Sequence, residues 1–212
     1  MKKMAVRFLY YCLGMVLLAA GISLTTKLGL GVSPIISVPY CISTLLNWNF
    51  GNVTLAVYCL FVVAVFLLKW NNAKIYDALQ IVVAIVFTRF LNLFAELMTF
   101  TIDTWWLKIV LLLASIVLTG IGIAMTVDMR LIPNPGDGIV QAISDRIHKN
   151  MGFTKNCFDL GCITCSIIMG LVFEGHLIGI GIGTVLCVIG VGRVVYFFNR
   201  LFQKKMCEQA GV

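Results

Sequence analysis

The sequence from Val16 to Gly51 reads VLLAAGISLTTKLGLGVSPIISVPYCISTLLNWNFG, and 101 positions further on it reads VLTGIGIAMTVDMRLIPNPGDGIVQAISDRIHKNMG. Aligned without a gap, the two stretches share eleven identical residues in 36 positions. Chance predicts roughly three in so apolar a composition, and an internal repeat should be recognised before other patterns are interpreted. We therefore predict a first repeat over residues 1–101 and a second over residues 102–212. The shared residues are Val16, Leu17, Gly21, Ile22, Thr25, Leu30, Pro34, Ile42, Ser43, Asn49 and Gly51, with their partners 101 positions later.

The composition is that of an integral membrane protein. The chain has 212 residues, of which 60% are hydrophobic and 12% are charged, whereas soluble domains carry about 25% charged residues. A membrane-spanning helix needs about 20 apolar residues. We predict an all-α fold, a single membrane domain over residues 1–212. Its six spans lie at about 5–27, 52–70, 75–98, 105–127, 155–173 and 177–198.

Three spans in each repeat place the second repeat in the membrane with the opposite orientation, a 3+3 inverted topology. The distribution of positive charge sets the orientation, because cytoplasmic loops are rich in Lys and Arg. If both termini lie in the cytoplasm, Lys27 and Lys108 are the only Lys or Arg residues predicted on the outer side, whereas twelve are predicted on the cytoplasmic side. The net charge of +7 then follows from topology and from contact with anionic lipids, and gives no reason to expect a nucleic-acid partner. The cytoplasmic charges are Lys2, Lys3, Arg7, Lys69, Lys74, Arg130, Arg146, Lys149, Lys155, Arg200, Lys204 and Lys205.

Each repeat continues after its first span with an irregular segment and a short apolar helix. We expect these helices at about 35–46, after the irregular segment 29–34, and at about 139–149, after the segment 132–138. They are too short to cross a bilayer, so a re-entrant or interfacial position is favoured.

Both short helices begin with a good N-cap residue followed by proline, a typical helix start. The pairs are Ser33-Pro34 and Asn134-Pro135, the second followed by Gly136, Asp137 and Gly138. The first N–H groups of a helix are free and its macrodipole is positive there. Brought together by two-fold pseudosymmetry, the two starts would bind an anion or a dipole; the alternative is two ordinary capped helices at the level of the headgroups.

Charged residues within the predicted spans are the other candidates for a site. Arg89 lies near the bilayer midplane, and Arg193 lies near the cytoplasmic end of the sixth span. An arginine at the centre of a helix costs at least about 2.5–3.5 kcal/mol and usually marks function or an ion pair; Arg193 can reach the interface instead. Candidate partners are Asp137, which can also cap its own helix, and Asp159, with Asn156 three residues before it on the same face. A third candidate is Glu96, near the outer end of its span.

The sequence offers no pattern for a metal, a cofactor or an enzyme active site. The Cys162-x-x-Cys165 pair has metal-like spacing, but no second pair accompanies it and the chain holds two histidines. Most of the eight cysteines lie in apolar spans, where thiols pack as small hydrophobic groups. We expect no metal, no cofactor and no catalytic activity.

Several motifs resemble those of a known family. They are Gly31-Val-Ser-Pro-Ile35, Pro135-Gly-Asp-Gly-Ile139, Phe158-Asp159, Gly179-x-Gly-x-Gly-Thr184 and Val191-Gly-Arg193. The chain in these elements resembles the YczE/YitT-like family of small bacterial integral membrane proteins, and the resemblance covers nearly the whole sequence. It implies a bacterial inner-membrane protein of five or six spans, with no established substrate. Relatives often carry proline at the position of Arg193.

The favoured function is a secondary transporter or permease that works by alternating access. Its predicted substrate is a small polar metabolite, and one form of the hypothesis is that this metabolite is an anion. In that hypothesis Ser33 and Asn134 bind the substrate with neighbouring amides, Arg89 neutralises an anionic group, and Asp137 or Asp159 pairs with the arginine or carries a coupling proton. The alternatives are a channel and a non-transporting module, either a substrate-capture subunit or a scaffold. The expected partners are the lipid bilayer and a small molecule, with a homodimer left open.

Overall fold

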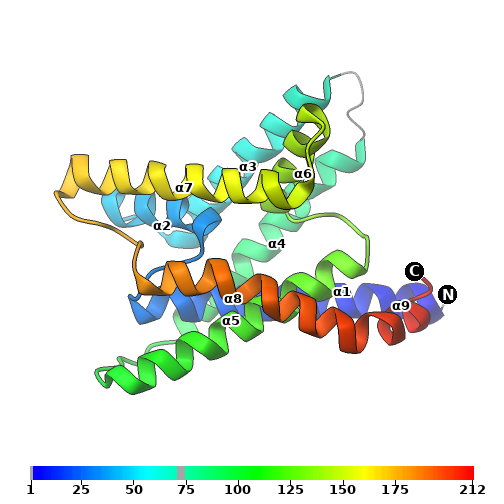
Figure 1. Cartoon of the computed structure of the whole chain (residues 1–212), viewed down its shortest axis with the longest axis horizontal. Helices are drawn as coiled ribbons and strands as arrows, with labels where there is room; N and C mark the ends of the chain where they lie inside the picture. Colours follow the sequence, from blue (N-terminus) through cyan, green and yellow to red (C-terminus); the bar gives the residue numbers. More distant parts are fainter. Residues whose placement is uncertain (1, 71–74) are drawn as a thin grey trace. The chain divides into compact units, whose positions relative to one another are not determined.

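The computed structural model describes residues 2–70 and 75–212, so Lys74, one of the charges assigned to the cytoplasm, lies outside the described residues. Throughout the described part of the chain the regular structure is helical, as predicted (Figure 1). The helices are α1 (Lys2–Leu28), α2 (Pro34–Leu46), α3 (Phe50–Lys69), α4 (Ile75–Leu97), α5 (Trp105–Asp128), α6 (Pro135–Ile147), α7 (Met151–Glu174), α8 (Ile182–Phe198), the π-helical turn η2 (Asn199–Gln203) and α9 (Lys204–Ala210).

Six of the described helices are long and apolar enough to cross a membrane, which confirms the six predicted spans. The sixth differs most from its predicted range, because it begins at Ile182 and continues to Ala210. Gly175 and Gly179 have φ values of 70°, a left-handed conformation that favours glycine and ends a helix. The segment predicted as the beginning of the sixth span is therefore a loop.

The boundaries and turns of the short helices recur at the spacing of the sequence repeat. Helices α2 and α6 both contain 13 residues, and their first residues are 101 positions apart. After α2, the Ser43 hydroxyl donates to the carbonyl oxygen of Trp48 at 2.8 Å; after α6, Ser144 donates to that of Lys149 at 2.7 Å. The same side chain closes the same turn in both halves of the chain.

Asn49 and Asn150 cap the following helices in the same way. The Oδ1 atom of Asn49 accepts from the backbone N–H of Asn52 at 2.9 Å, and that of Asn150 accepts from Phe153 at 2.7 Å. We expect Asn150→Ala to lower the free energy of unfolding by about 1 kcal/mol, because one helix N–H loses its partner. Thermal unfolding in detergent measures this, with the exposed Asn156→Ala on the same helix as the control. Equal stability of both variants would contradict the capping role.

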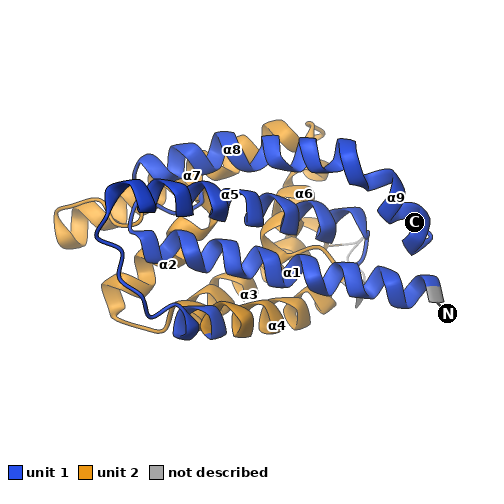
Figure 2. Ribbon diagram, turned by 90° about the horizontal axis from the view of Figure 1, so that it is seen from below, with its two compact units in different colours: residues 1–33, 93–131, 181–212 blue, residues 34–92, 132–180 orange. Residues whose placement is uncertain are grey.

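The chain forms two compact units, coloured separately in Figure 2. Unit 1 comprises residues 1–33, 93–131 and 181–212, and unit 2 comprises residues 34–92 and 132–180. Each unit therefore contains segments from both sequence repeats.

In unit 1 the first long helices of the two repeats, α1 and α5, pack closely against each other. A Cβ atom at Gly21 would lie 2.8 Å from the carbonyl oxygen of Ser115, and one at Gly122 would lie 2.7 Å from that of Gly14. Gly21 and Gly122 are equivalent in the repeat, as are Gly14 and Ser115. The same backbone contact is thus made twice with its roles exchanged, as across a two-fold axis.

Helices α1 and α5 run antiparallel, because contacts move toward the start of α5 as they move along α1. Near the beginning of α1, Arg7 donates to the carbonyl oxygens of Met129 at 2.6 Å and Arg130 at 2.8 Å. Further along, the Thr25 hydroxyl donates to that of Ser115 at 3.0 Å. Arg7 thereby satisfies carbonyl groups that the end of α5 leaves without helical partners. Helix α8 packs on α5, and α9 packs on α1.

In unit 2 the short helices pack on long helices of the other repeat. Helix α2 lies on α7, and α6 lies on α3. Val65 of α3 forms an apolar core with Ile139, Val140 and Ala142 of α6. Helix α4 contacts α3 through Phe87, whose ring stacks on that of Tyr58 with a centroid separation of 6.1 Å.

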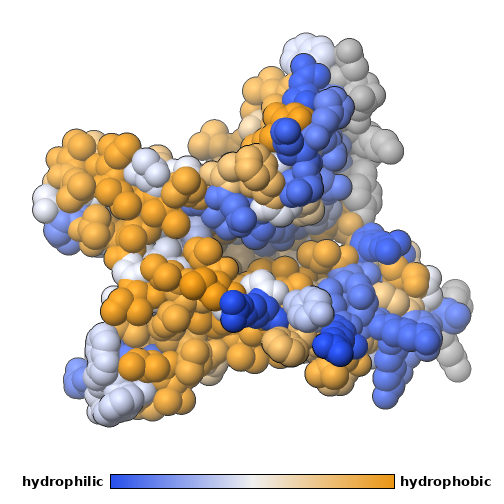
Figure 3. Space-filling model, viewed as in Figure 1, coloured by the Kyte–Doolittle hydropathy of each residue, from blue (hydrophilic) through white to orange (hydrophobic). Residues whose placement is uncertain are grey.

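The outer surfaces of the long helices are apolar, as a lipid environment requires. Exposed side chains of α3 include Leu60, Val63 and Leu67. In the view of Figure 3 hydrophobic residues cover most of the long helices, and hydrophilic residues gather at α6 and near the chain ends.

Candidate functional site

The first turns of α2 and α6 meet inside unit 2. A Cβ atom at Gly136, the second residue of α6, would lie 2.7 Å from Cδ1 of Ile35, the second residue of α2. These two residues are equivalent in the sequence repeat. Pro34 and Pro135 begin the two helices and are both buried. The two helix starts singled out by the sequence therefore lie against each other.

Helix α6 begins earlier than expected, and its cap differs from the prediction. The backbone carbonyl of Asn134 accepts from the N–H groups of Asp137 at 2.9 Å and Gly138 at 2.8 Å, which draws residues 135–138 into the helix. The side chain of Asn134 makes no capping hydrogen bond. It lies instead within hydrogen-bonding reach of the buried Tyr58 of α3. The helix start is thus capped by backbone geometry, and the amide side chain is left for other contacts.

Three buried side-chain oxygens border this first turn without a hydrogen-bond partner among the described residues. They are Oε1 of Gln80, Oδ1 of Asn134 and Oδ1 of Asp159. Gln80, on α4, is only 1% exposed, and its Oε1 occupies the space where a Cβ atom at Gly138 would lie. Glycine at position 138 therefore makes room for the Gln80 amide. Unpaired buried polar atoms are rare and call for an explanation.

Two carboxylates and one ammonium group complete the cluster. Nζ of Lys155 lies 3.8 Å from Oδ1 of Asp137, and Asp159, one turn further along α7, lies within electrostatic reach of both. The side chains of Lys155 and Asp137 are 40% and 23% exposed, so the cluster reaches from the surface of unit 2 to its interior. We call the set Tyr58, Gln80, Asn134, Asp137, Lys155 and Asp159 the polar cluster.

Hydroxyl groups continue from the polar cluster toward the start of α2. Oγ of Ser37 and Oγ of Ser166 are 2.8 Å apart, and either hydroxyl can donate to the other. The one that accepts can donate to a backbone carbonyl group, that of Pro34 at 2.6 Å from Ser37 or that of Cys162 at 3.0 Å from Ser166. Hydroxyls pair helices α2 and α7 here, as is common in helical membrane proteins.

The structure brings together many of the predicted site residues, but not all. Pro34, Pro135, Gly136 and Gly138 form the joined helix starts, and Asn134, Asp137 and Asp159 belong to the polar cluster. Ser33 belongs to unit 1.

The arginines and Asn156 are not in the cluster. The side chain of Arg89 is exposed, and its Nη2 atom donates to Oδ1 of Asn52 at 3.3 Å. The expectation of a buried arginine is therefore wrong, because Arg89 lies on the outward face of α4 while Phe87 and Thr88 face inward. Asn156 and Arg193 are exposed as well.

Sequence reasoning missed Tyr58, Gln80 and Lys155. Tyr58 carried a signal, because it precedes Asp159 by 101 positions and so occupies the equivalent place in the first repeat. Gln80 and Lys155 carried none, since their importance depends on which helices pack against α6.

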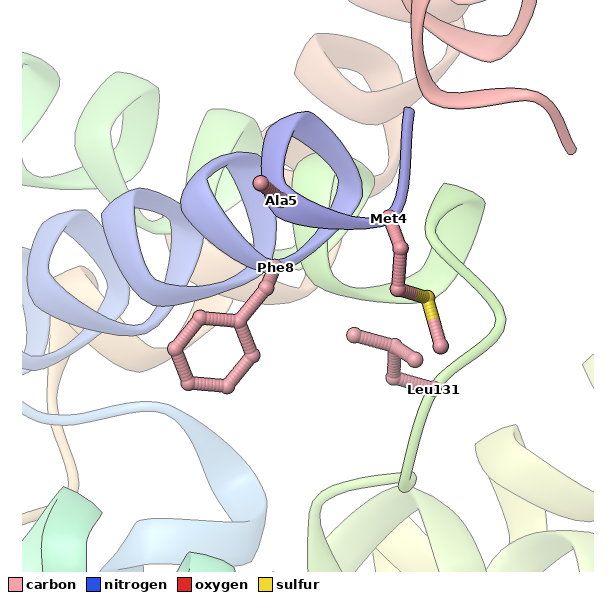
Figure 4. A pocket seen from close by; sticks show the side chains of 4 residues that line it. All are labelled: Met4, Ala5, Phe8 and Leu131. Atoms are coloured by element: carbon pink, nitrogen blue, oxygen red, sulfur yellow. The ribbon is translucent and has the colours of Figure 1, made fainter. Parts of the chain in front are cut away.

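An apolar recess of about 460 Å³ lies elsewhere, in unit 1. Its walls are Met4, Ala5, Phe8 and Leu131 (Figure 4). A recess without polar groups cannot orient a polar ligand, so it is not the candidate site.

Six apolar helices of membrane-spanning length, with polar groups buried in one unit, define a multi-pass helical membrane protein. The chain belongs to the family of unknown function DUF6198, whose model matches residues 5–200.

Relatives among known proteins match most of the chain. The chain is 26% identical over 199 residues to the uncharacterized membrane protein YczE of Bacillus subtilis, covering 92% of this chain and 86% of that protein. It is 22% identical to the uncharacterized protein YyaS of Bacillus subtilis, covering 93% and 94% of the two chains, and 24% identical to an uncharacterized protein of Haemophilus influenzae, covering 89% and 81%. No solved structure matches. These matches confirm the YczE-like part of the resemblance; its YitT part stays a prediction.

Proposed function

We propose that this protein is a secondary transporter for a small polar metabolite, and that the polar cluster is its binding site. The observation that carries the proposal is the meeting of two short helix starts, at Ile35 and Gly136, beside buried oxygens that have no hydrogen-bond partner in the described part of the chain. Transporters bind substrates at the ends of discontinuous helices near the bilayer midplane. Polar groups inside a membrane bundle are costly and normally mark such a site.

The proposed architecture is a 3+3 inverted repeat with both termini in the cytoplasm of a bacterial inner membrane. Three observations support it: the antiparallel packing of α1 on α5, the reciprocal contacts of Gly21 and Gly122, and the exchanged pairing of α2 with α7 and of α6 with α3. A two-fold axis within the membrane plane produces these relations.

The same symmetry suggests a mechanism of alternating access. The pairs α2–α7 and α3–α6 are equivalent under exchange of the repeats, so a conformation open on one side has a counterpart open on the other. Rocking of one pair against the other at Ile35 and Gly136 would expose the polar cluster to each side in turn. Gly136 has no side chain, so its contact with Ile35 allows the movement with little rearrangement.

The test is uptake by the purified protein in proteoliposomes, with labelled methylammonium, glycine, succinate and glycerol as probes. We expect saturable uptake of at least one probe, and an initial rate at least about tenfold lower in Asp159→Asn, since a hydrogen bond to a charged group contributes about 1.5–3 kcal/mol. Asp145→Asn, an exposed aspartate of α6 outside the cluster, is the matched control. Equal rates for both variants would refute the assigned site.

Other results of the same assay favour the alternative functions. Saturable binding without uptake would favour a capture subunit that depends on a partner. Uptake that rises linearly with probe concentration would favour a channel. If neither binding nor uptake were detected, a scaffold would be the remaining function.

A further inference from the structure

We infer that the polar cluster takes a cationic nitrogen group, so that the transported molecule is an amine or carries one; this rests on the proposed function. The first hypothesis from the sequence was an anion at two positive helix ends. The atoms that the structure brings to this place favour the opposite charge.

The unpaired groups are hydrogen-bond acceptors. Oε1 of Gln80, Oδ1 of Asn134 and Oδ1 of Asp159 border the first turn of α6 without partners among the described residues. An amide oxygen or a carboxylate accepts hydrogen bonds and cannot donate one, whereas a primary ammonium group has three donors and no acceptor. A ligand with N–H donors can therefore pair with such oxygens, whereas an anion offers them no donor.

The net charge of the cluster has the same sign. The cluster contains two carboxyl groups, those of Asp137 and Asp159, and one amino group, that of Lys155. A single negative charge remains on the fully ionised cluster. A charge buried among apolar helices is stable only when it is paired, and a monovalent cation supplies that pair.

The features that favoured an anion are weak in the folded chain. Pro135 has no N–H group, and the N–H groups of Asp137 and Gly138 already donate to the carbonyl oxygen of Asn134. The carboxylate of Asp137 lies in the first turn of α6, where it offsets the positive end of the helix dipole. Arg89, the group expected to neutralise the anion, lies on the outward face of α4 and donates a hydrogen bond to Asn52 of α3.

The donor set favours an organic cation over a metal ion. In the residues that the structure describes, no group of three His, Cys, Asp or Glu side chains is arranged to hold a metal. Two of the three unpaired oxygens of the cluster belong to amide side chains. Amide oxygens are neutral and readily accept hydrogen bonds from N–H donors.

The experiment measures thermal stabilisation of the purified full-length protein in detergent at constant ionic strength in potassium chloride. The probes are methylammonium chloride, sodium chloride, potassium acetate and potassium phosphate. A ligand that binds the folded state raises the melting temperature in a saturable way. We expect this for methylammonium alone, with an apparent affinity about tenfold lower in Asp159→Asn and in Gln80→Leu, and unchanged in Asp145→Asn.

A milder variant guards against loss of folding. In Gly138→Ala the added Cβ atom displaces the flexible end of Gln80 and not backbone. We expect it to fold and to bind methylammonium several times more weakly. Saturable stabilisation by acetate or phosphate, by sodium alone, or by none of the four salts would overturn the inference. The inference would also be overturned if Asp159→Asn and Gly138→Ala bound methylammonium with the same affinity as the unsubstituted protein.

Uptake of the same probes in proteoliposomes separates this inference from the proposed function. Methylammonium binding without uptake of any probe would support the cation site and refute transport. Uptake of acetate but not methylammonium would support transport and refute the cation site.

Discussion

The variants Gly21→Leu and Gly122→Leu should each destabilise the protein severely and to the same extent. At Gly122 even a Cβ atom would lie 2.5 Å from the backbone nitrogen of Leu18, far inside a normal contact. The opposing atoms are backbone atoms of the partner helix, so no rotamer change relieves the clash and α1 must move away from α5. We expect a loss of about 3 kcal/mol for each variant, the upper end of the usual cost of overpacking.

Thermal or denaturant unfolding in detergent measures this loss. The matched controls are Gly192→Leu on α8 and Gly161→Leu on α7, since a Cβ atom at either glycine meets no atom within 4 Å among the described residues. Both controls should remain folded. Unequal losses at Gly21 and Gly122 would contradict the two-fold relation between α1 and α5, and equal stability of all four variants would contradict the close contact itself.

Cysteines placed at Trp48 and Lys149 should react with a membrane-impermeant thiol reagent from opposite faces of the membrane. The two residues lie at equivalent turns of the repeat, each held by a serine hydroxyl, and both are exposed. Three long helices, α3, α4 and α5, separate them. An odd number of crossings puts the ends of a segment on opposite sides, so the expected difference in labelling is all or none.

The assay requires a background in which the eight native cysteines are replaced. In intact cells Trp48→Cys should be labelled at once, whereas Lys149→Cys should be labelled only after the membrane is permeabilised. Lys27→Cys serves as the outside control and Lys205→Cys as the inside control, according to the charge distribution. Labelling of Trp48→Cys and Lys149→Cys from the same face of the membrane would refute the inverted topology. If all four variants were labelled from the face opposite to the expected one, the predicted orientation in the membrane would be reversed.

Much of the fold was predictable because membrane helices are specified by local sequence. Twenty apolar residues in succession form a span whatever surrounds them, because a bilayer leaves backbone groups no other partners. The turns that follow the short helices were also local, since Ser43 and Ser144 each bond within five residues of their own position. The loop before α8 was missed, because hydropathy does not distinguish glycines in a helix from glycines that end one.

The site was predictable only in part. Pro34 and Pro135 marked two helix starts by local chemistry, and the repeat suggested that these starts meet. Burial of a single charged side chain could not be predicted in this way, because hydropathy does not show which side of a helix is turned toward the lipid. Arg89 was for this reason expected inside and lies outside, and Gln80 was overlooked although it is fully buried.

The sequence by itself determined the class of protein, its six apolar helices of membrane-spanning length, the 101-residue spacing of its repeated residues and the two prolines at which the short helices begin. Those properties depend on residues close in the chain or on a fixed spacing along it. Only the tertiary structure decided that Gln80 of α4 and Asp159 of α7 lie near the first turn of α6, which follows Asn134, because the packing of these helices depends on long-range contacts. It also carries our proposal of a cationic ligand, since a helix start attracts anions only where its amides are free and no carboxylates lie beside it.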